Sequence, residues 1–229
     1  MSSQYTIMSV GGSLIIPKTG FNVPFLKKFR QLLLSQIAEG EKYIIVIGGG
    51  ATARSYQDAA KSVTKLSNDD LDWIGIYSTV YNAQFVRMLF QDVAYKEVIT
   101  NPRKKIKTNK PLIIAAGEKP GSSTDYRAVL LAKTYGAASL INVSNIEYVY
   151  TKDPAIYPDA EKIERIGWKA FREHIAGDEW IAGKNVPFDP VASKEAERSH
   201  IQVKIVHGHQ IAEVKKAMKG KPFKGTIIE

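Results

Sequence analysis

The sequence predicts an α/β fold, and three observations lead to that prediction. Short apolar runs typical of buried strands alternate with stretches of helical apolar spacing along the 229 residues. Two of the runs, 5–10 and 43–47, end in glycines. A helical pattern lies between these two runs, which indicates a βαβ unit with both glycine loops at one edge of a parallel sheet.

The composition narrows the class of protein. With 44% hydrophobic residues, the chain can bury one sizeable α/β core, with room for two lobes. The absence of cysteine excludes disulfides, thiolate metal sites and cysteine nucleophiles. The four histidines show no metal-ligand spacing, and we interpret His207-Gly208-His209 as a surface turn. No apolar run approaches the roughly 18 residues of a membrane span, and no signal-peptide core precedes the first strand, so we expect a cytoplasmic protein without a membrane partner.

The net charge of +9 is compatible with nucleic acid, but also with small anionic substrates such as nucleotides. The densest basic run, 103–110, lacks the interleaved aromatic residues of a single-strand-binding face, so we interpret it as a solvated loop. We expect no nucleic-acid partner. A nucleic-acid-binding protein is a hypothesis that rests on charge alone, and it would require binding that weakens steeply with salt.

The other elements are predicted from apolar spacing and end signals. Helices are expected over 21–38, 51–65, 67–90, 126–135, 191–199 and 211–218. Strands are expected over 95–100, 111–116, 138–143, 202–206 and 225–228, with a short hairpin in 144–154 and an irregular segment over 155–190.

The glycines after the second strand predict an anion site. Gly48-Gly49-Gly50 lack Cβ atoms, so backbone N–H groups can approach an anion at the positive start of the next helix. Arg54 lies in the first turns of that helix, where its guanidinium can make a two-pronged contact to the same anion. Each glycine loop alone is also consistent with an ordinary turn; the pair predicts a place where two phosphates meet.

Three further stretches have a structural and a ligand-binding interpretation. Asp72, placed in the first turn of its helix, is either a favourable charge at the helix dipole or an acceptor for a sugar diol. Thr124-Asp125 ends a loop rich in hydroxyls and glycine, and is either a helix cap or a group that orients a reacting atom or holds magnesium through water. Tyr150 followed by Asp153 can clamp an adenosine.

Taken in order, these motifs resemble the amino-acid-kinase family, and within it the archaeal-type uridylate (UMP) kinases, over nearly the whole chain. The motifs are Gly11-Gly12-Ser13, Gly48-Gly49-Gly50 with Arg54, Asp72-Trp73-Ile74-Gly75, Pro120-Gly121 leading to Thr124-Asp125, Tyr150-Thr151-Lys152-Asp153-Pro154, Asp189-Pro190 and Gly225-Thr226-Ile227-Ile228-Glu229. The resemblance implies a three-layer αβα sandwich with a mainly parallel central sheet. It implies a single domain over 1–229, with an acceptor-binding lobe to about 135 and an ATP-binding lobe from about 136.

The resemblance also implies an activity and an assembly. Members of the family transfer the γ-phosphoryl group of ATP, with magnesium, to UMP and give UDP, and UMP kinases of the family are hexamers. In-line transfer between two bound nucleotides depends mainly on positioning and charge neutralisation, so it requires no covalent nucleophile.

Site roles follow from the resemblance position by position. Gly12, Ser13, Gly50 and Arg54 would hold the ATP phosphates, and Ser144, Tyr150 and Asp153 the adenosine. UMP would be held by Gly49, Asp72, Glu118, Lys119, Pro120, Gly121, Ser122, Ser123 and Thr124. The catalytic groups would be Arg54, Asp125 and Asp189, the two acids orienting the reacting groups and magnesium; no resident metal site is expected.

The chain departs from the family pattern at three places. Ser9 stands where many members have a lysine, which archaeal-type members can also lack; another cation would then substitute, with Lys18 and Lys184 as candidates. Glu147-Tyr148 replaces an Asp-Gly pair, and the loop 118–124 is altered. The first two departures support an alternative, a nucleotide-binding storage or regulatory homologue with little turnover. An isopentenyl phosphate kinase would have a histidine soon after the glycine triplet, and 52–55 contain none.

Overall fold

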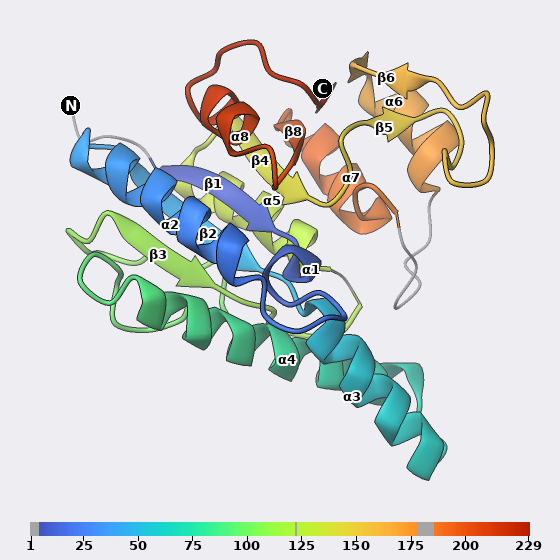
Figure 1. Cartoon of the computed structure of the whole chain (residues 1–229), viewed down its shortest axis with the longest axis horizontal. Helices are drawn as coiled ribbons and strands as arrows, with labels where there is room; N and C mark the ends of the chain where they lie inside the picture. Colours follow the sequence, from blue (N-terminus) through green and yellow to red (C-terminus); the bar gives the residue numbers. More distant parts are fainter. Residues whose placement is uncertain (1–4, 122, 178–185) are drawn as a thin grey trace.

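A seven-stranded, mainly parallel sheet forms the centre of the protein (Figure 1). The computed structural model describes residues 5–121, 123–177 and 186–229. The strand order is β3-β2-β1-β4-β8-β9-β7. The bounds are β1 (Tyr5–Val10), β2 (Lys42–Ile47), β3 (Leu112–Ala115), β4 (Ser139–Ser144), β7 (Arg165–Ile166), β8 (Gln202–His207) and β9 (Thr226–Ile228). Neighbouring strands pair in parallel except β8 with β9, which are antiparallel.

The register places the two glycine loops at the same edge of the sheet. Val10 pairs with Ile47 of β2 and with Val143 of β4, so the three strands end side by side. The chain moves outward from β1 to β3 in one direction and from β4 to β8 in the other. In open α/β sheets such a reversal opens a crevice beyond the carboxyl ends of the strands. The predicted βαβ unit is thereby confirmed.

Helices cover both faces of the sheet, which confirms the three-layer sandwich (Figure 1). One core contains side chains from α2 (Val23–Ala38), α4 (Asn68–Leu89) and α8 (Ile211–Met218). The opposite core contains side chains from α5 (Thr124–Tyr135), α6 (Trp168–Phe171) and α7 (Pro190–Arg198). Along β2, Ile45 points into the first core whereas Ile44 and Val46 point into the second. Because both faces are covered, β3 and residues 43–47 of β2 are continuously apolar.

Two helices begin directly at the glycine loops. These are α1 (Gly12–Ile15) and α3 (Gly50–Val63), as the sequence predicts for the second loop. The helix α4 begins with a capping box in which the Ser67 hydroxyl accepts from the Asp70 N–H and the Asp70 carboxylate accepts from the Ser67 N–H. Gly136 ends α5 at a φ of 71°, a conformation that glycine adopts without steric cost.

Three expectations about elements are wrong. The segment 95–100 is not a strand: only single bridges join Ala94 to Leu112 and Ile99 to Ala115. The hairpin expected within 144–154 is wrong in extent, because β5 (Val149–Tyr150) pairs with β6 (Lys162–Ile163) in a separate two-stranded sheet. The segment expected to be irregular also contains β7, α6 and a π-helix, η1 (Arg172–Ala176). Among the described residues, no helix is long and apolar enough to cross a bilayer.

Candidate active site

A cavity of about 770 Å³ opens beyond the carboxyl ends of β1 and β2. Its volume lies in the range of small-molecule sites, roughly 300–1,000 Å³. Both glycine loops, the beginning of α3 and part of α4 line it, together with Gly117, Ser123 and Thr124 and with Asn145 and His209 just after β4 and β8. Of the residues predicted to bind ligand, Ser13, Gly49, Gly50, Arg54, Asp72, Ser123 and Thr124 lie in its wall.

The two glycine loops pack backbone against backbone. A Cβ on Gly12 would lie 2.2 Å from the Gly50 nitrogen, so no larger residue fits there. Gly50 has a φ of 62°, which also favours glycine. The N–H groups of Gly12, Ser13 and Gly50 are not used in the backbone hydrogen bonds of the described residues. Donors of this kind beside the first turn of α3 fit a phosphate.

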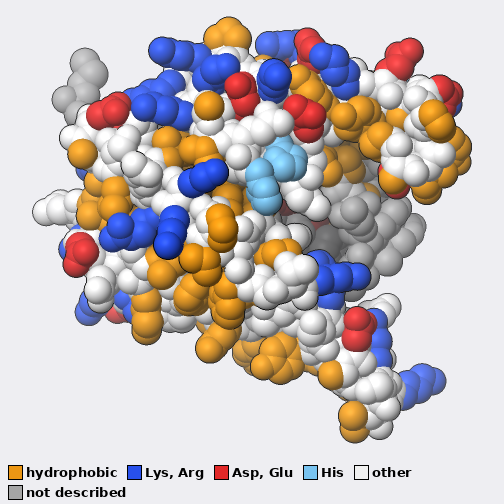
Figure 2. All heavy atoms as spheres, in the orientation of Figure 1, with side chains coloured by type: hydrophobic (Ala, Val, Ile, Leu, Met, Phe, Trp, Pro, Cys, Tyr) orange, Lys and Arg blue, Asp and Glu red, His pale blue; other side chains and the backbone are white. Residues whose placement is uncertain are grey.

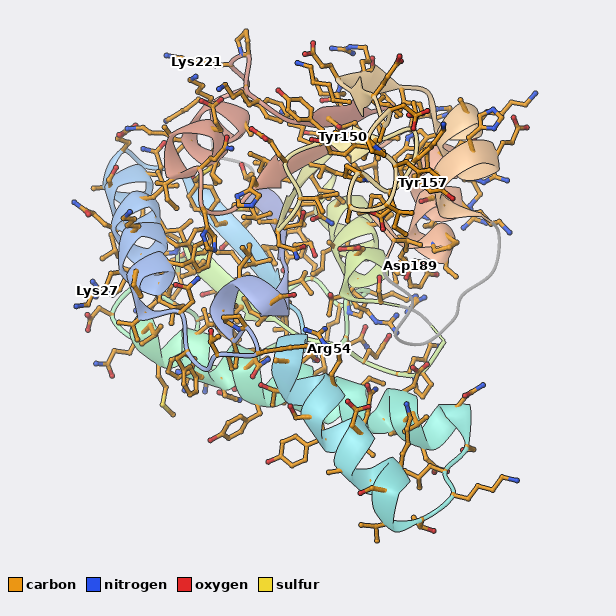
Figure 3. All side chains as sticks on the ribbon, turned by 45° about the vertical axis from the view of Figure 1, so that its right-hand side comes forward. Lys27, Arg54, Tyr150, Tyr157, Asp189 and Lys221 are labelled. Atoms are coloured by element: carbon orange, nitrogen blue, oxygen red, sulfur yellow. The ribbon has the colours of Figure 1, made fainter. Side chains whose placement is uncertain are left out.

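Cations outnumber acids in the cavity wall. Among the described lining residues, Arg54 and Lys18 are cationic and Asp72 is the single carboxylate. Arg54 is exposed and forms no ion pair with another described residue, so its guanidinium is available to an anion (Figure 3). Two lysines were candidates to replace the cation that is absent at Ser9. Lys18 lines the cavity, and Lys184 lies outside the described residues.

Asn82, on the buried face of α4, holds the second glycine loop in place. Its fully buried amide donates to the carbonyl oxygens of Gly48, at 3.0 Å, and Gly49, at 2.9 Å. Thr79, one turn earlier on α4, accepts a 2.9 Å hydrogen bond from the Gly117 N–H. The buried face of α4 thus holds both the glycine loop and the start of the 117–121 segment.

Asp72 joins α4 to the predicted acceptor loop. It lies just beyond the first turn of α4, which contains Asp69 and Asp70, so its placement in that turn was wrong. Its carboxylate accepts a 3.0 Å hydrogen bond from the Gly121 N–H. The loop is thereby drawn toward the cavity.

A buried arginine holds the other side of the same loop. The guanidinium of Arg127 on α5 is 1% exposed, donates to the Lys119 carbonyl at 2.7 Å and lies 3.5 Å from the Glu118 carboxylate. Arg103 contacts the same carboxylate at 3.4 Å. Glu118, Lys119 and Pro120 therefore flank the cavity without lining it, and Ser122 lies outside the described residues.

Asp125 lies in a polar cluster beneath the ends of β1 and β4. It accepts hydrogen bonds from the Ser9 hydroxyl at 2.8 Å and from the Asn142 amide at 3.0 Å. Burial raises the pKa of Asp125 to about 7, and the charge of Asp189 raises it as well, whereas the Ser9 hydrogen bond lowers it. Ser9, at the lysine position of the family, thus supplies a neutral donor to this acid.

Asp189 connects two helix starts. Its side chain is 1% exposed and accepts from the N–H groups of Val191 and Ala192 as the N-cap of α7. It also accepts a 2.7 Å hydrogen bond from the N–H of Ser123, the N-cap of α5. Thr124 and Asp125 are therefore the first helical residues and not the cap itself. Asp189 does not line the cavity, and it orients the residues that precede Asp125.

The predicted adenosine residues are not gathered in the cavity. The Ser144 hydroxyl accepts from the Ile146 N–H at 3.3 Å, and Asp153 accepts from the Ala155 N–H at 2.9 Å. Tyr150 lies in β5, away from Arg54 (Figure 3). Glu147 accepts a hydrogen bond from Gln210 at 2.8 Å. Asn145 is the member of this region that lines the cavity.

Several polar residues of the site are not predictable from the motifs in the sequence. His209 lines the cavity and its Nε2 lies 3.3 Å from the Asn22 amide nitrogen, so the 207–209 turn is more than a surface feature. Thr79 and Asn82 had a usable signal, because polar side chains on the buried face of a helix need partners. His209 and Asn22 had none, since only the fold brings them together.

The carboxylates near the site could supply only one or two of the ligands of a magnesium ion. The described residues contain no group of three or more His, Asp or Glu side chains that could hold a metal ion. Magnesium often keeps several waters and binds through one or two carboxylates together with substrate phosphates. Asp125, which accepts from Ser9 two positions before the first glycine loop but does not line the cavity, is the carboxylate that would take this part.

Comparison with known proteins places these features in a family. A model of the amino acid kinase family matches residues 4–207. The uridylate kinase of Thermococcus sibiricus is 33% identical over 225 residues, which cover 97% of this chain and 98% of that one. The uridylate kinase of Methanocorpusculum labreanum is 31% identical over 224 residues, covering 97% and 94%.

Solved structures agree with the sequence comparison. The crystal structure of uridylate kinase from Archaeoglobus fulgidus matches with a TM-score of 0.82 and 29% identity, covering 98% of this chain and all of that one. The UMP kinase of Bacillus anthracis, at 18% identity and a TM-score of 0.74, shares the fold. With this sheet order, these paired glycine loops and a family model that spans most of its length, the chain belongs to the amino acid kinase family.

Proposed function

We propose that the protein transfers the γ-phosphoryl group of ATP to UMP, giving UDP and ADP. The observation that carries the proposal is the cavity itself, in which two glycine loops converge with Asp72 and with Arg54, which forms no ion pair with another described residue. The named uridylate kinases of similar length support UMP as the acceptor.

The roles of the residues follow from their positions. The N–H groups of Gly12, Ser13 and Gly50 would bind phosphate oxygens, and Arg54 would neutralise charge that develops on the transferring group. Asp72 and the 118–124 loop would orient UMP, with Gly49 at its phosphate. Ser144, Tyr150 and Asp153 would bind the adenosine, so the lobe to about 135 would hold the acceptor and the lobe from about 136 the donor.

The two acids have different parts in the proposal. Asp125 would hold magnesium, directly or through water, and orient the reacting groups, while Asp189 would keep Ser123 and the start of α5 in place. Magnesium would neutralise charge on the phosphates. We also propose the hexamer that the resemblance implies; the cytoplasmic location stays a prediction.

The proposal is tested by measuring ADP release with ATP and magnesium against UMP, CMP, AMP, GMP and isopentenyl phosphate. Turnover with UMP well above the other acceptors is the expected result. Turnover with a different acceptor would reject UMP. Binding of ATP without turnover on any acceptor would favour the storage or regulatory homologue, which the neutral Ser9 beside Asp125 makes a specific second candidate.

A further inference from the structure

A second cavity, of about 690 Å³, lies on the flank of the sheet. It shares no lining residue with the first cavity. Four of its side chains are cationic, namely Arg165, Lys204, Lys221 and Lys224, and one is acidic, Glu164. Lys and Arg side chains gather along the upper edge of the protein in Figure 2, around α8 and the segment that follows it. We call this space the flank cavity.

Lys204 is the central observation. In β8, Val203 and Ile205 point into the core with α5 and α7, so Lys204 between them points to the opposite face. Its side chain is half-buried and has no hydrogen bond or ion pair with another described residue. Burial lowers the pKa of Lys204, and no acid compensates. A bound anion would supply the missing charge.

Glu164, the only acid among the described residues that line the flank cavity, does not supply this charge, because it is paired with Lys162 at 2.7 Å. Arg165 forms an ion pair with Glu229 at the rim. Lys221 has no ion-pair partner among the described residues and extends from the protein beside the cavity (Figure 3). The cavity therefore carries an excess of positive charge.

Aromatic rings complete the wall. Tyr148 and Phe223 line the flank cavity, and the Lys162 ammonium lies 5.0 Å from the Tyr148 ring centroid. Tyr148 stands in the Glu147-Tyr148 pair that replaces the Asp-Gly of the family pattern. The replacement thus contributes to the flank cavity and not to the first one.

We propose that the flank cavity is a second binding site, for a nucleoside triphosphate, separate from the phosphoryl-transfer site. The triphosphate would lie against Lys204, Lys221 and Lys224, and the base against the rings of Tyr148 and Phe223. The Val149 N–H next to Tyr148 donates to the Thr226 hydroxyl at 2.8 Å, so the backbone beside Tyr148 is anchored to β9.

Calorimetric titration of the whole protein with inorganic triphosphate, without magnesium or acceptor, tests the charge contribution. The variant Lys204→Gln removes the central cation with little change of shape, and Lys65→Gln is the matched control on an exposed lysine after α3. We expect Lys204→Gln to lower the affinity of one binding event about tenfold or more, because one charge-assisted contact is lost. Lys65→Gln should match the unchanged protein. Equal binding by both variants, or no binding to the unchanged protein, would overturn the proposal.

A second titration compares ATP with inorganic triphosphate in the unchanged protein and in Tyr148→Ala. We expect ATP to bind the flank cavity more tightly, and the preference to fall about tenfold in Tyr148→Ala, as for loss of a stacked base. An unchanged preference would reject the base contact. Both titrations measure affinity without turnover, so they give the same answer whether or not UMP proves to be the acceptor.

Discussion

The guanidinium of Arg54 lies in the cavity wall near the beginning of α3. It is exposed, and no ion pair ties it to another described residue. We therefore expect Arg54→Ala to lower kcat by about 10²–10³-fold, the usual effect of losing one donor to developing charge. The melting temperature should not change. Activity assays and thermal unfolding of Arg54→Ala check this, with Lys65→Ala as control; full activity would remove Arg54 from the mechanism.

Asp125 gives a prediction about pH. The unfolded chain releases this proton near pH 4, whereas burial holds the pKa of Asp125 at about 7 in the folded protein. The folded state therefore binds more protons between these values, and the contribution of Asp125 to stability falls as pH rises from 4 to 7. Asp125→Asn removes this dependence.

We expect the stability of Asp125→Asn, relative to the unchanged protein, to rise by roughly 2 kcal/mol from pH 4.5 to pH 8, allowing for partial solvent screening. Denaturant unfolding at several pH values measures the difference. Every other titrating group is common to both proteins, so it cancels. A difference that stays constant with pH would show that Asp125 ionises normally.

At the scale of elements, α4 serves the site through its buried face. The amide of Asn82 is the only described side-chain donor to the carbonyls of Gly48 and Gly49. Asn82→Leu would leave both carbonyls without this donor, so we expect about 1–3 kcal/mol lower stability and weaker nucleotide binding. The matched control is Ser78→Ala on the same buried face, because the Ser78 hydroxyl donates only to the Ile74 carbonyl of its own helix. Equal stability and equal nucleotide binding in the two variants would show that α4 does not hold the glycine loop in place.

Helices and strands long enough to show a repeated apolar spacing were predictable from the sequence, whereas two-residue strands were not. The helices over 23–38 and 211–218 and the longer strands of the central sheet follow from apolar spacing and end signals in the sequence. The two-residue strands β5, β6 and β7 leave none. The segment 95–100 looks like a strand, but only Ile99 forms a bridge to β3 there, so pairing is not sustained.

The candidate site was predictable where a motif lies within one loop. Gly49, Gly50 and Arg54 are close in sequence and line the cavity together. The contact of Asp72 with Gly121 spans 49 positions, and that of Ser9 with Asp125 spans 116, so both needed the fold. The predicted lysine substitute shows the same limit, since nothing in the local sequence of Lys18 places it in the cavity.

At the scale of the whole molecule, α4 also leaves an apolar stripe uncovered. Trp73, Tyr77, Tyr81 and Met88 are 37%, 66%, 71% and 62% exposed. The first three are spaced four residues apart, so they share one face of the helix. Large exposed apolar side chains that lie next to each other often mark an interaction site. We infer that a second copy of the chain covers this stripe in the proposed hexamer.

The double variant Tyr77→Lys with Tyr81→Lys places like charges on that stripe, which is costly to bury without partners. We expect the unchanged protein to have six times the chain mass by size-exclusion chromatography with light scattering, and the double variant to form a smaller species. Tyr157→Lys is the matched control, because Tyr157 is 49% exposed and lies away from α4 (Figure 3). It should leave the mass unchanged. A monomeric unchanged protein would reject the hexamer, and a double variant that stays hexameric would move the interface away from α4.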